Sequence, residues 1–215
     1  MISTLHLIGL CGVGVFAISG ALAAGRKNFD LLGVAIIALV TAIGGGTLRD
    51  VLLNRHPIFW IADSTYLLVI LASAAGTVLY VRFRHPPYRA LLIADAFGLG
   101  FFTISGAQVA EAEGLPVIIV ILMGAITGSA GGLLRDVLSA EVPLLLRKGE
   151  LYATASIIGG AVYSLLKGTH CPHPLPPLIG AAVIIVLRLA AIRWRLALPV
   201  FRAPGEEIED HSREK

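Results

Sequence analysis

Two arginine–aspartate pairs stand in long apolar stretches of the sequence, Arg49-Asp50 in one and Arg135-Asp136 in the other. A charged side chain is costly inside a membrane, about 2.5–3.5 kcal/mol for an arginine at the centre of a helix, and those that remain usually line a polar pathway. Because neighbouring residues on a helix point roughly 100° apart, we expect each arginine to find its carboxylate on another helix. Asp95 is the predicted partner of Arg135. The alternative is that each arginine, near the end of its segment, extends to the lipid headgroups.

A run of small residues precedes each pair, Gly44-Gly45-Gly46 in the first stretch and Ala130-Gly131-Gly132 in the second. Glycine costs roughly 1 kcal/mol relative to alanine inside a helix, so we predict a kink or break in both segments. Interrupted helices at equivalent positions of a membrane protein typically mark a transport pathway. We therefore predict a pathway between the two segments. The alternative is close packing, because small residues let membrane helices approach each other.

Side chains that could line this pathway or balance its charge surround the two runs. Hydroxyl oxygens would act as uncharged ligands for a cation, and carboxylates would neutralise the arginines. The candidates are Thr41, Thr47, Asp50, Asp95, Thr127, Ser129, Asp136, Ser19 and Ser105. For the two serines the alternative is a hydrogen bond within their own helix or to a neighbouring helix.

The sequence shows no pattern of a catalytic or metal site. The six histidines are scattered at or near loops and termini, and Cys11 and Cys171 suggest neither a disulfide nor a metal ligand set. Nucleotide-binding and metalloprotease motifs are absent. We therefore expect a protein that is not an enzyme, with no cofactor and no nucleic-acid partner.

The charged pairs and the glycine runs belong to an internal duplication with an offset of 86 residues. The segment Phe16-x-Ile18-Ser19-Gly20-Ala21 returns as Phe102-x-Ile104-Ser105-Gly106-Ala107, and Gly45-Gly46-x-Leu48-Arg49-Asp50 returns as Gly131-Gly132-x-Leu134-Arg135-Asp136. We take residues 1–86 as the first three-helix repeat and residues 87–172 as the second. Three spans are an odd number of crossings, which predicts that the second repeat is inverted in the membrane.

The elements that must position these residues are membrane helices. The 215 residues are 56% hydrophobic and 14% charged, against roughly 45–50% and about 25% in soluble domains. We predict an all-α membrane protein, because apolar runs of about 20 residues, enough to cross roughly 30 Å of hydrocarbon, recur along the chain. The seven predicted spans are Leu5–Ala24, Leu31–Leu53, Thr65–Val81, Ala90–Ala110, Leu115–Leu138, Leu151–Leu166 and Leu175–Ile192.

Positive charges predict the orientation of the chain. Lys and Arg gather in alternate loops, which by the positive-inside rule places the N-terminus outside and the C-terminus in the cytoplasm. These residues are Arg26, Lys27, Arg82, Arg84, Arg89, Arg147, Lys148, Arg193, Arg195 and Arg202. Basic residues follow the first span and do not precede it, so we expect it to be retained rather than cleaved as a signal peptide. Residues 173–196 form a seventh span outside the duplication, and residues 197–215 a polar cytoplasmic tail.

The duplicated Gly-Gly-x-Leu-Arg-Asp segments, with Ile-Ser-Gly-Ala ahead of them, resemble the bacterial members of the trimeric intracellular cation channel family over about residues 1–196. The resemblance implies a homotrimer among the lipids of a bacterial or archaeal inner membrane, without a known protein partner. Each subunit would conduct potassium, or sodium, through its own pore between the glycine-kinked second and fifth spans. The positions that match as pore or hinge residues are Gly44, Gly45, Gly46, Arg49, Gly131, Gly132 and Arg135. Ala130 stands where Gly44 does in the first repeat, which predicts a stiffer second kink.

Arginines facing a pore would favour anions by Coulomb's law, so cation conduction needs the aspartates or the hydroxyl groups to outweigh them. Related domains also occur in proteins regarded as carriers of small amino acids, and a secondary transporter of a small solute such as glycine is the second hypothesis. A membrane scaffold in which the glycines only pack is the third.

Overall fold

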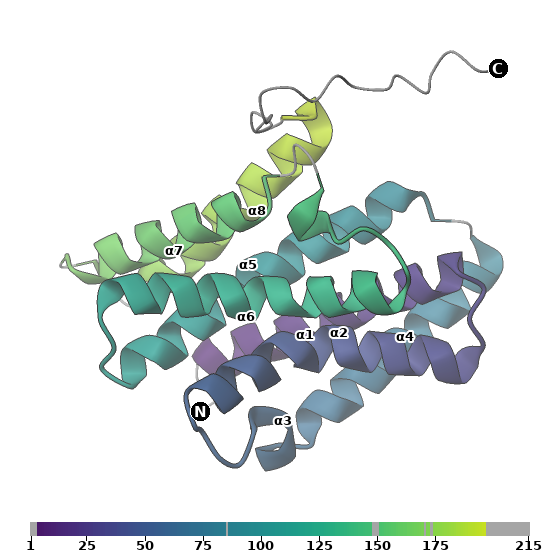
Figure 1. Cartoon of the computed structure of the whole chain (residues 1–215), viewed down its shortest axis with the longest axis horizontal. Coiled ribbons are helices and arrows are strands. Elements are labelled where there is room, and N and C mark those ends of the chain that lie inside the picture. Colours follow the sequence, from purple (N-terminus) through teal and green to yellow (C-terminus); the bar gives the residue numbers. More distant parts are fainter. Residues whose placement is uncertain (1–3, 85, 148–150, 170, 173, 197–215) are drawn as a thin grey trace, which may run out of the picture.

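The computed structural model describes residues 4–84, 86–147, 151–169, 171–172 and 174–196, and within them the chain forms helices and no strand (Figure 1). The predicted polar tail, residues 197–215, lies outside the described residues. The helices are α1 (Thr4–Arg26), α2 (Leu31–Leu52), α3 (Phe59–Ala62), α4 (Thr65–Phe83), α5 (Tyr88–Ala112), α6 (Val117–Leu138), the 3-10 helix η1 (Leu144–Leu146), α7 (Ala153–Lys167) and α8 (Leu175–Trp194).

Six of these helices, α1, α2, α4, α5, α6 and α8, are long and apolar enough to cross a membrane. Each coincides with a predicted span to within a few residues at either end. Helix α7 occupies the predicted span Leu151–Leu166 but has 15 residues, a length of about 22 Å. An all-helical membrane protein is therefore confirmed, with six helices of spanning length and a shorter one.

Local signals at the helix ends determine where the spans begin and stop. The Asp30 carboxylate caps α2 by accepting a hydrogen bond from Gly33 N at 2.7 Å. Pro87 and Pro116 stand directly before α5 and α6. Proline lacks an N–H group, and this costs nothing there because an N–H at the start of a helix has no partner within the helix. Asn54 and Ala140, equivalent in the duplication, follow α2 and α6 with φ of 52°, the left-handed conformation that ends many helices.

Helices α1 and α5 lie at the centre of the fold. Their apolar windows are 67% and 72% buried, against 22% for α4. Helix α5 packs against α1, α6 and α8, and α2 packs against α1 and α6. Figure 1 shows α2 and α6 crossing the molecule in opposite chain directions. The central helices are thus the first helix of each sequence repeat.

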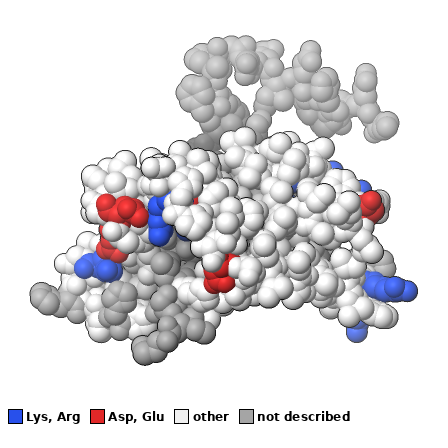
Figure 2. All heavy atoms as spheres, turned by 90° about the horizontal axis from the view of Figure 1, so that it is seen from below, with Lys and Arg blue, Asp and Glu red and all other residues white. Residues whose placement is uncertain are grey.

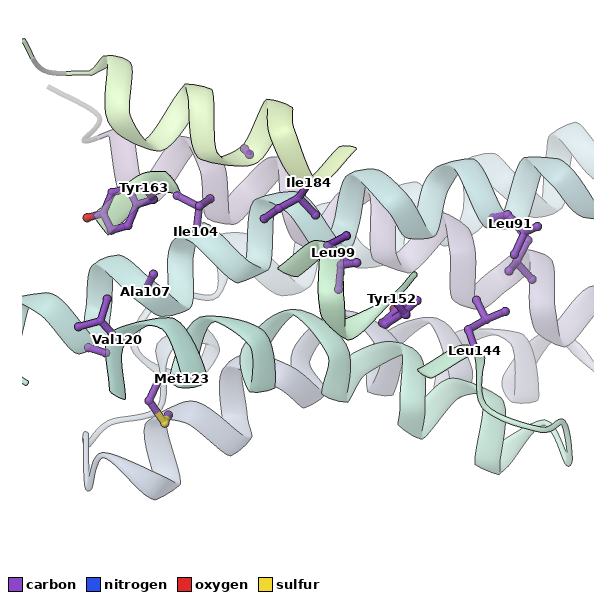
Figure 3. Packing of buried hydrophobic residues seen from close by; sticks show 14 of the residues in the cluster. Leu91, Leu99, Ile104, Ala107, Val120, Met123, Leu144, Tyr152, Tyr163 and Ile184 are labelled. Carbon is purple, nitrogen blue, oxygen red and sulfur yellow. The ribbon is translucent and has the colours of Figure 1, made fainter. Parts of the chain in front are cut away.

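The core consists of two apolar clusters, one made mainly of first-half residues and the other mainly of second-half residues. The first-half cluster includes Phe16 and Ile70, and the second-half cluster, seen in Figure 3, includes Leu99 and Ile184. The rings of Phe16 and Phe102 stack with centroids 5.2 Å apart and join the two halves.

The glycine runs do not break their helices. Helices α2 and α6 continue without interruption through Gly44-Gly45-Gly46 and through Gly131-Gly132. Of the predicted kink or break, the break is therefore wrong and the kink stays a prediction. A Cβ atom on Gly45 would lie 1.9 Å from the carbonyl oxygen of Thr127, and one on Gly131 would lie 2.3 Å from that of Thr41. The glycines therefore let α2 and α6 cross at backbone contact, and this packing offsets their low helix propensity.

The outer surface is largely apolar. In the face shown in Figure 2, charged residues lie over the left half of the view and at its right edge, and most of the surface between them is uncharged. Large hydrophobic side chains such as Leu31, Leu68 and Ile118 are about 70% exposed. Such a belt is expected of helices whose outer faces contact lipid.

Candidate functional site

Arg135 of α6 lies in the interior, 0% exposed, and three side chains accept its hydrogen bonds. Its Nε donates to Asp136 Oδ1 at 2.8 Å, and its Nη1 donates to Asp95 Oδ1 of α5 at 2.6 Å and to Ser19 Oγ of α1. The predicted pairing of Arg135 with Asp95 is thus present. We call Arg135, Asp136, Asp95, Ser19 and Tyr152 the Arg135 cluster.

Arg49 of α2 occupies a similar site at the equivalent position. It is 4% exposed, its Nε and Nη2 each lie 2.8 Å from Asp50 Oδ1, and its Nη1 lies 3.4 Å from Ser105 Oγ of α5. The ring of Phe59 lies 5.5 Å from its guanidinium carbon. We call Arg49, Asp50, Ser105 and Phe59 the Arg49 cluster. Because both arginines are buried within the protein, neither extends to the headgroups as the alternative required.

The expectation that each arginine finds its carboxylate on another helix is wrong for Arg49 and holds only in part for Arg135. Arg49 pairs with Asp50, and Arg135 pairs with Asp136. The Cα–Cβ bonds of adjacent helical residues do diverge, but the arginine side chain is long enough for its guanidinium to turn back to the neighbouring carboxylate. Each buried arginine therefore has a counter-charge on its own helix, whatever the other helices add.

The two arginines exchange contacts between the halves of the sequence. Arg135 of the second half bonds Ser19 of the first, and Arg49 of the first half bonds Ser105 of the second. The two serines are equivalent in the duplication, and so are the two arginines. Each serine therefore bonds a side chain of a neighbouring helix, as the alternative for these two residues allowed.

Asp50 and Asp136 also hold the chain that follows their helices. The second oxygen of Asp50 accepts a hydrogen bond from Phe59 N at 2.9 Å, and that of Asp136 accepts one from Leu144 N at 2.8 Å. Each aspartate thereby ties a short helix, α3 or η1, back to the end of a spanning helix.

The clusters differ in the number of carboxylates that meet the arginine. Asp95 corresponds to Gly9 in the first half, so Arg135 meets two carboxylates and Arg49 meets one. Tyr152 donates its hydroxyl hydrogen to Asp95 Oδ1 at 3.2 Å, whereas the equivalent hydroxyl of Tyr66 lies 2.8 Å from where a Cβ of Gly9 would be.

The structure adds two residues that the sequence interpretation did not select, Tyr152 and Arg188. Arg188 of α8 is 0% exposed, and its guanidinium carbon lies 4.7 Å above the Tyr152 ring centroid. The alignment of Tyr152 with Tyr66 in the duplication, and an arginine inside the last apolar span, were signals that could have found them.

The remaining predicted residues lie in the helix crossing or close to it. Thr41, Thr127 and Ser129 donate to carbonyl oxygens of their own helices at 2.6 Å. Thr47 Oγ1 accepts a hydrogen bond from Trp60 Nε1 at 3.0 Å. A Cβ atom would meet Leu134 at Gly44, Phe59 at Gly46 and the Tyr152 hydroxyl at Gly132.

A hollow of about 220 Å³ with several charged side chains in its lining lies beside Asp136, at the end of the molecule next to the Arg135 cluster. Glu141 lies 2.6 Å from Lys27 and 3.3 Å from Arg147 at its rim. The hydrogen bond of Glu141 with Lys27 and the positive charge of Lys27 lower the pKa of the Glu141 carboxyl. The other lining residues are Ala23, Arg26, Tyr88, Leu91 and Ser139.

The fold and the two clusters define a multi-pass helical membrane protein with paired charges buried in its interior. The family model described as Glycine transporter matches the chain twice, over residues 6–83 and 92–168. The chain belongs to this family and to the bacterial trimeric intracellular cation channels, as the resemblance implied. It is not an enzyme.

Relatives cover nearly the whole chain. The UPF0126 membrane protein of Vibrio cholerae is 44% identical over 93% of this chain and 83% of its own length, and the UPF0126 inner membrane protein YadS of Escherichia coli K12 is 44% identical over 91% and 95%. The structure of a trimeric intracellular cation channel orthologue from Rhodobacter sphaeroides has a TM-score of 0.84 at 38% identity, covering 89% of this chain and 98% of that one. A prokaryotic channel of this kind in 0.5 M KCl has a TM-score of 0.84 at 32% identity, over 91% and 98%.

Proposed function

We propose that the protein is a channel for monovalent cations, chiefly potassium, with a pathway inside each subunit between α2 and α6. The observation that carries this proposal is that each buried arginine beside the glycine crossing bonds a serine from the other half of the sequence. Similarity to solved cation channels at 32–38% identity supports the same assignment. In this structure the crossing is at backbone contact, so conduction requires α2 and α6 to separate there.

The arrangement that fits this function is a pair of inverted three-helix repeats with α8 as a seventh span and α7 as the sixth. A two-fold axis in the membrane plane would relate the two halves of such an arrangement. Its equivalent contacts would be those of Gly45 and Gly131 at the crossing, and those of Ser19 and Ser105 with the two arginines. Residues 1–86 and 87–172 would be the repeats, with the N-terminus outside and the C-terminus in the cytoplasm. Solved relatives described as trimeric support a homotrimer.

The buried aspartates remove the electrostatic objection to cations. Asp50 offsets the charge of Arg49, and Asp95 and Asp136 together outnumber Arg135. A cation passing the Arg135 cluster would meet carboxylate oxygens as well as a guanidinium group. The arginines in this proposal hold the closed pathway together by bonding across the halves.

A carrier for glycine or a similar small solute is the second candidate, and the description of the matching family favours it. The same helix crossing would then move around a bound zwitterion. A scaffold without transport would leave the buried charges unexplained, since packing does not need them.

Recording from purified protein in planar bilayers tests the proposal. Unitary currents under a KCl gradient, with a reversal potential near that of potassium, are the expected result. Saturable uptake of labelled glycine into liposomes without unitary currents would overturn it in favour of the carrier, and silence in both assays would favour the scaffold. Replacing Gly131 with leucine, which fills the crossing, is a variant expected to abolish the activity, and Gly76→Leu on exposed α4 is its control.

A further inference from the structure

Arg188 is the most unexpected charge in the molecule. It lies in the apolar helix α8, outside the duplicated region, and its large side chain is fully buried. An ionisable residue in such a segment is costly and usually has a role in transport. The second-half apolar cluster surrounds this part of α8, where Figure 3 shows Ile184 near Leu99 and Tyr152.

Arg188 contacts a side chain that belongs to the Arg135 cluster. Its guanidinium lies over the face of Tyr152, which is 1% exposed, at a distance typical of cation–π interactions. The Tyr152 hydroxyl donates to Asp95 Oδ1, and this same oxygen accepts the hydrogen bond of Arg135. Contacts therefore continue from α8 through Tyr152 and Asp95 to α6.

The other half of the molecule shows what this connection adds. Tyr66 stands where Tyr152 does, but Gly9 replaces Asp95, so the hydroxyl of Tyr66 has no carboxylate at that position. The duplication also provides no counterpart of α8. The connection is therefore a feature of the Arg135 cluster and not of the Arg49 cluster.

We propose that Arg188 is a positioning residue that acts through Tyr152 on Asp95 and so sets how tightly Asp95 holds Arg135. The inference rests on the proposed channel function. Asp95 Oδ1 divides its charge between two donors, Tyr152 at 3.2 Å and Arg135 at 2.6 Å. Loss of the tyrosine donor concentrates that charge on Arg135, which strengthens the bond that keeps the pathway closed.

A cycle of two substitutions tests this order of contacts. Tyr152→Phe keeps the ring beneath Arg188 but removes the hydroxyl that reaches Asp95. Arg188→Gln removes the cation above the ring. Each change alone is expected to lower the single-channel open probability roughly threefold, the size of a modest change in one buried hydrogen bond. In the Tyr152→Phe background, Arg188→Gln is expected to have no further effect.

Arg193→Gln is the matched control, because Arg193 lies in the last turn of the same helix and is exposed. Arg188→Lys keeps the positive charge and is the variant to use if Arg188→Gln does not assemble, with an intermediate effect expected. A full Arg188→Gln effect in the Tyr152→Phe background, or an effect no larger than that of Arg193→Gln, would overturn the inference.

A second measurement separates failure of the inference from failure of the proposed function. If the unmodified protein carries no current, the channel assignment fails. Thermal melting of Asp95→Asn, Arg188→Gln and the double variant then tests the connection between Arg188 and Asp95 without a channel assay. Coupled residues give losses that do not add, which would support the connection. Additive losses would contradict it.

Discussion

Lys27 Nζ lies 2.6 Å from Glu141 Oε1, and in the duplicated sequence these two positions are held by Glu113 and Arg55, which lie 3.2 Å apart. The same contact thus occurs twice with its charges reversed. Each pair joins a residue after the first helix of one half to a residue after the second helix of the other half. Because the charges are reversed but both pairs remain attractive, we infer that an ion pair at this position matters in both halves of the molecule.

Reversing one charge of such a pair should loosen its end of the molecule. In Lys27→Glu, two carboxylates face each other, and we expect a higher open probability in bilayer recordings. The combined Lys27→Glu and Glu141→Lys variant restores the attraction and should return toward the unmodified protein. Because exposed ion pairs are weak, the single effect should also shrink at high salt. A double variant as altered as the single one would contradict the assignment.

The Lys27–Glu141 pair predicts a dependence of stability on pH. Its partner lowers the pKa of Glu141 in the folded protein, so the stabilisation is present above the unfolded value of 4.5 and is lost as the pH falls through the lower folded value. The difference in melting temperature between the unmodified protein and Glu141→Gln should be constant above about pH 6 and vanish in the acidic range. A difference that grows as the pH falls would have the wrong sign.

Alanine at the crossing glycines should destabilise the protein. A Cβ atom at Gly45 or Gly131 meets a backbone carbonyl oxygen, which cannot move aside as a side chain can. We expect a loss of at least about 2 kcal/mol for either substitution, seen as a lower melting temperature in detergent. Gly76→Ala is the control, because nothing lies within 4 Å of its Cβ position on α4. That substitution should be neutral or stabilise by up to about 1 kcal/mol.

Asp95 and Arg135 should depend on each other. Replacing Asp95 with leucine leaves a buried guanidinium with one carboxylate fewer and should cost about 3–5 kcal/mol. The double variant Asp95→Leu, Arg135→Leu should lose less than the two single losses together. A double-mutant cycle of thermal melting measures this coupling, with exposed Arg82→Gln as a control for general charge effects. Losses that add would mean that the contact contributes little.

Several features could be predicted from the sequence because they depend on local patterns. Runs of about 20 apolar residues predict helices of spanning length, since the bilayer sets that length wherever the helix packs. The aligned Arg49-Asp50 and Arg135-Asp136 segments mark equivalent sites. The pairing of Asp95 with Arg135 followed from the placement of both residues at the same end of adjacent spans.

The tertiary structure decided what these residues do. Whether Gly45 and Gly131 break a helix or pack it depends on which backbone comes to lie against them, and here it is that of Thr127 and Thr41. Arg49 turns to Asp50 because the flexible arginine side chain adapts to its surroundings, which the direction of its Cα–Cβ bond does not reveal. The contact of Arg188 with Tyr152 joins separate helices. Sequence periodicity shows which face of a helix is apolar, but only packing between helices chooses the partner of each buried polar group.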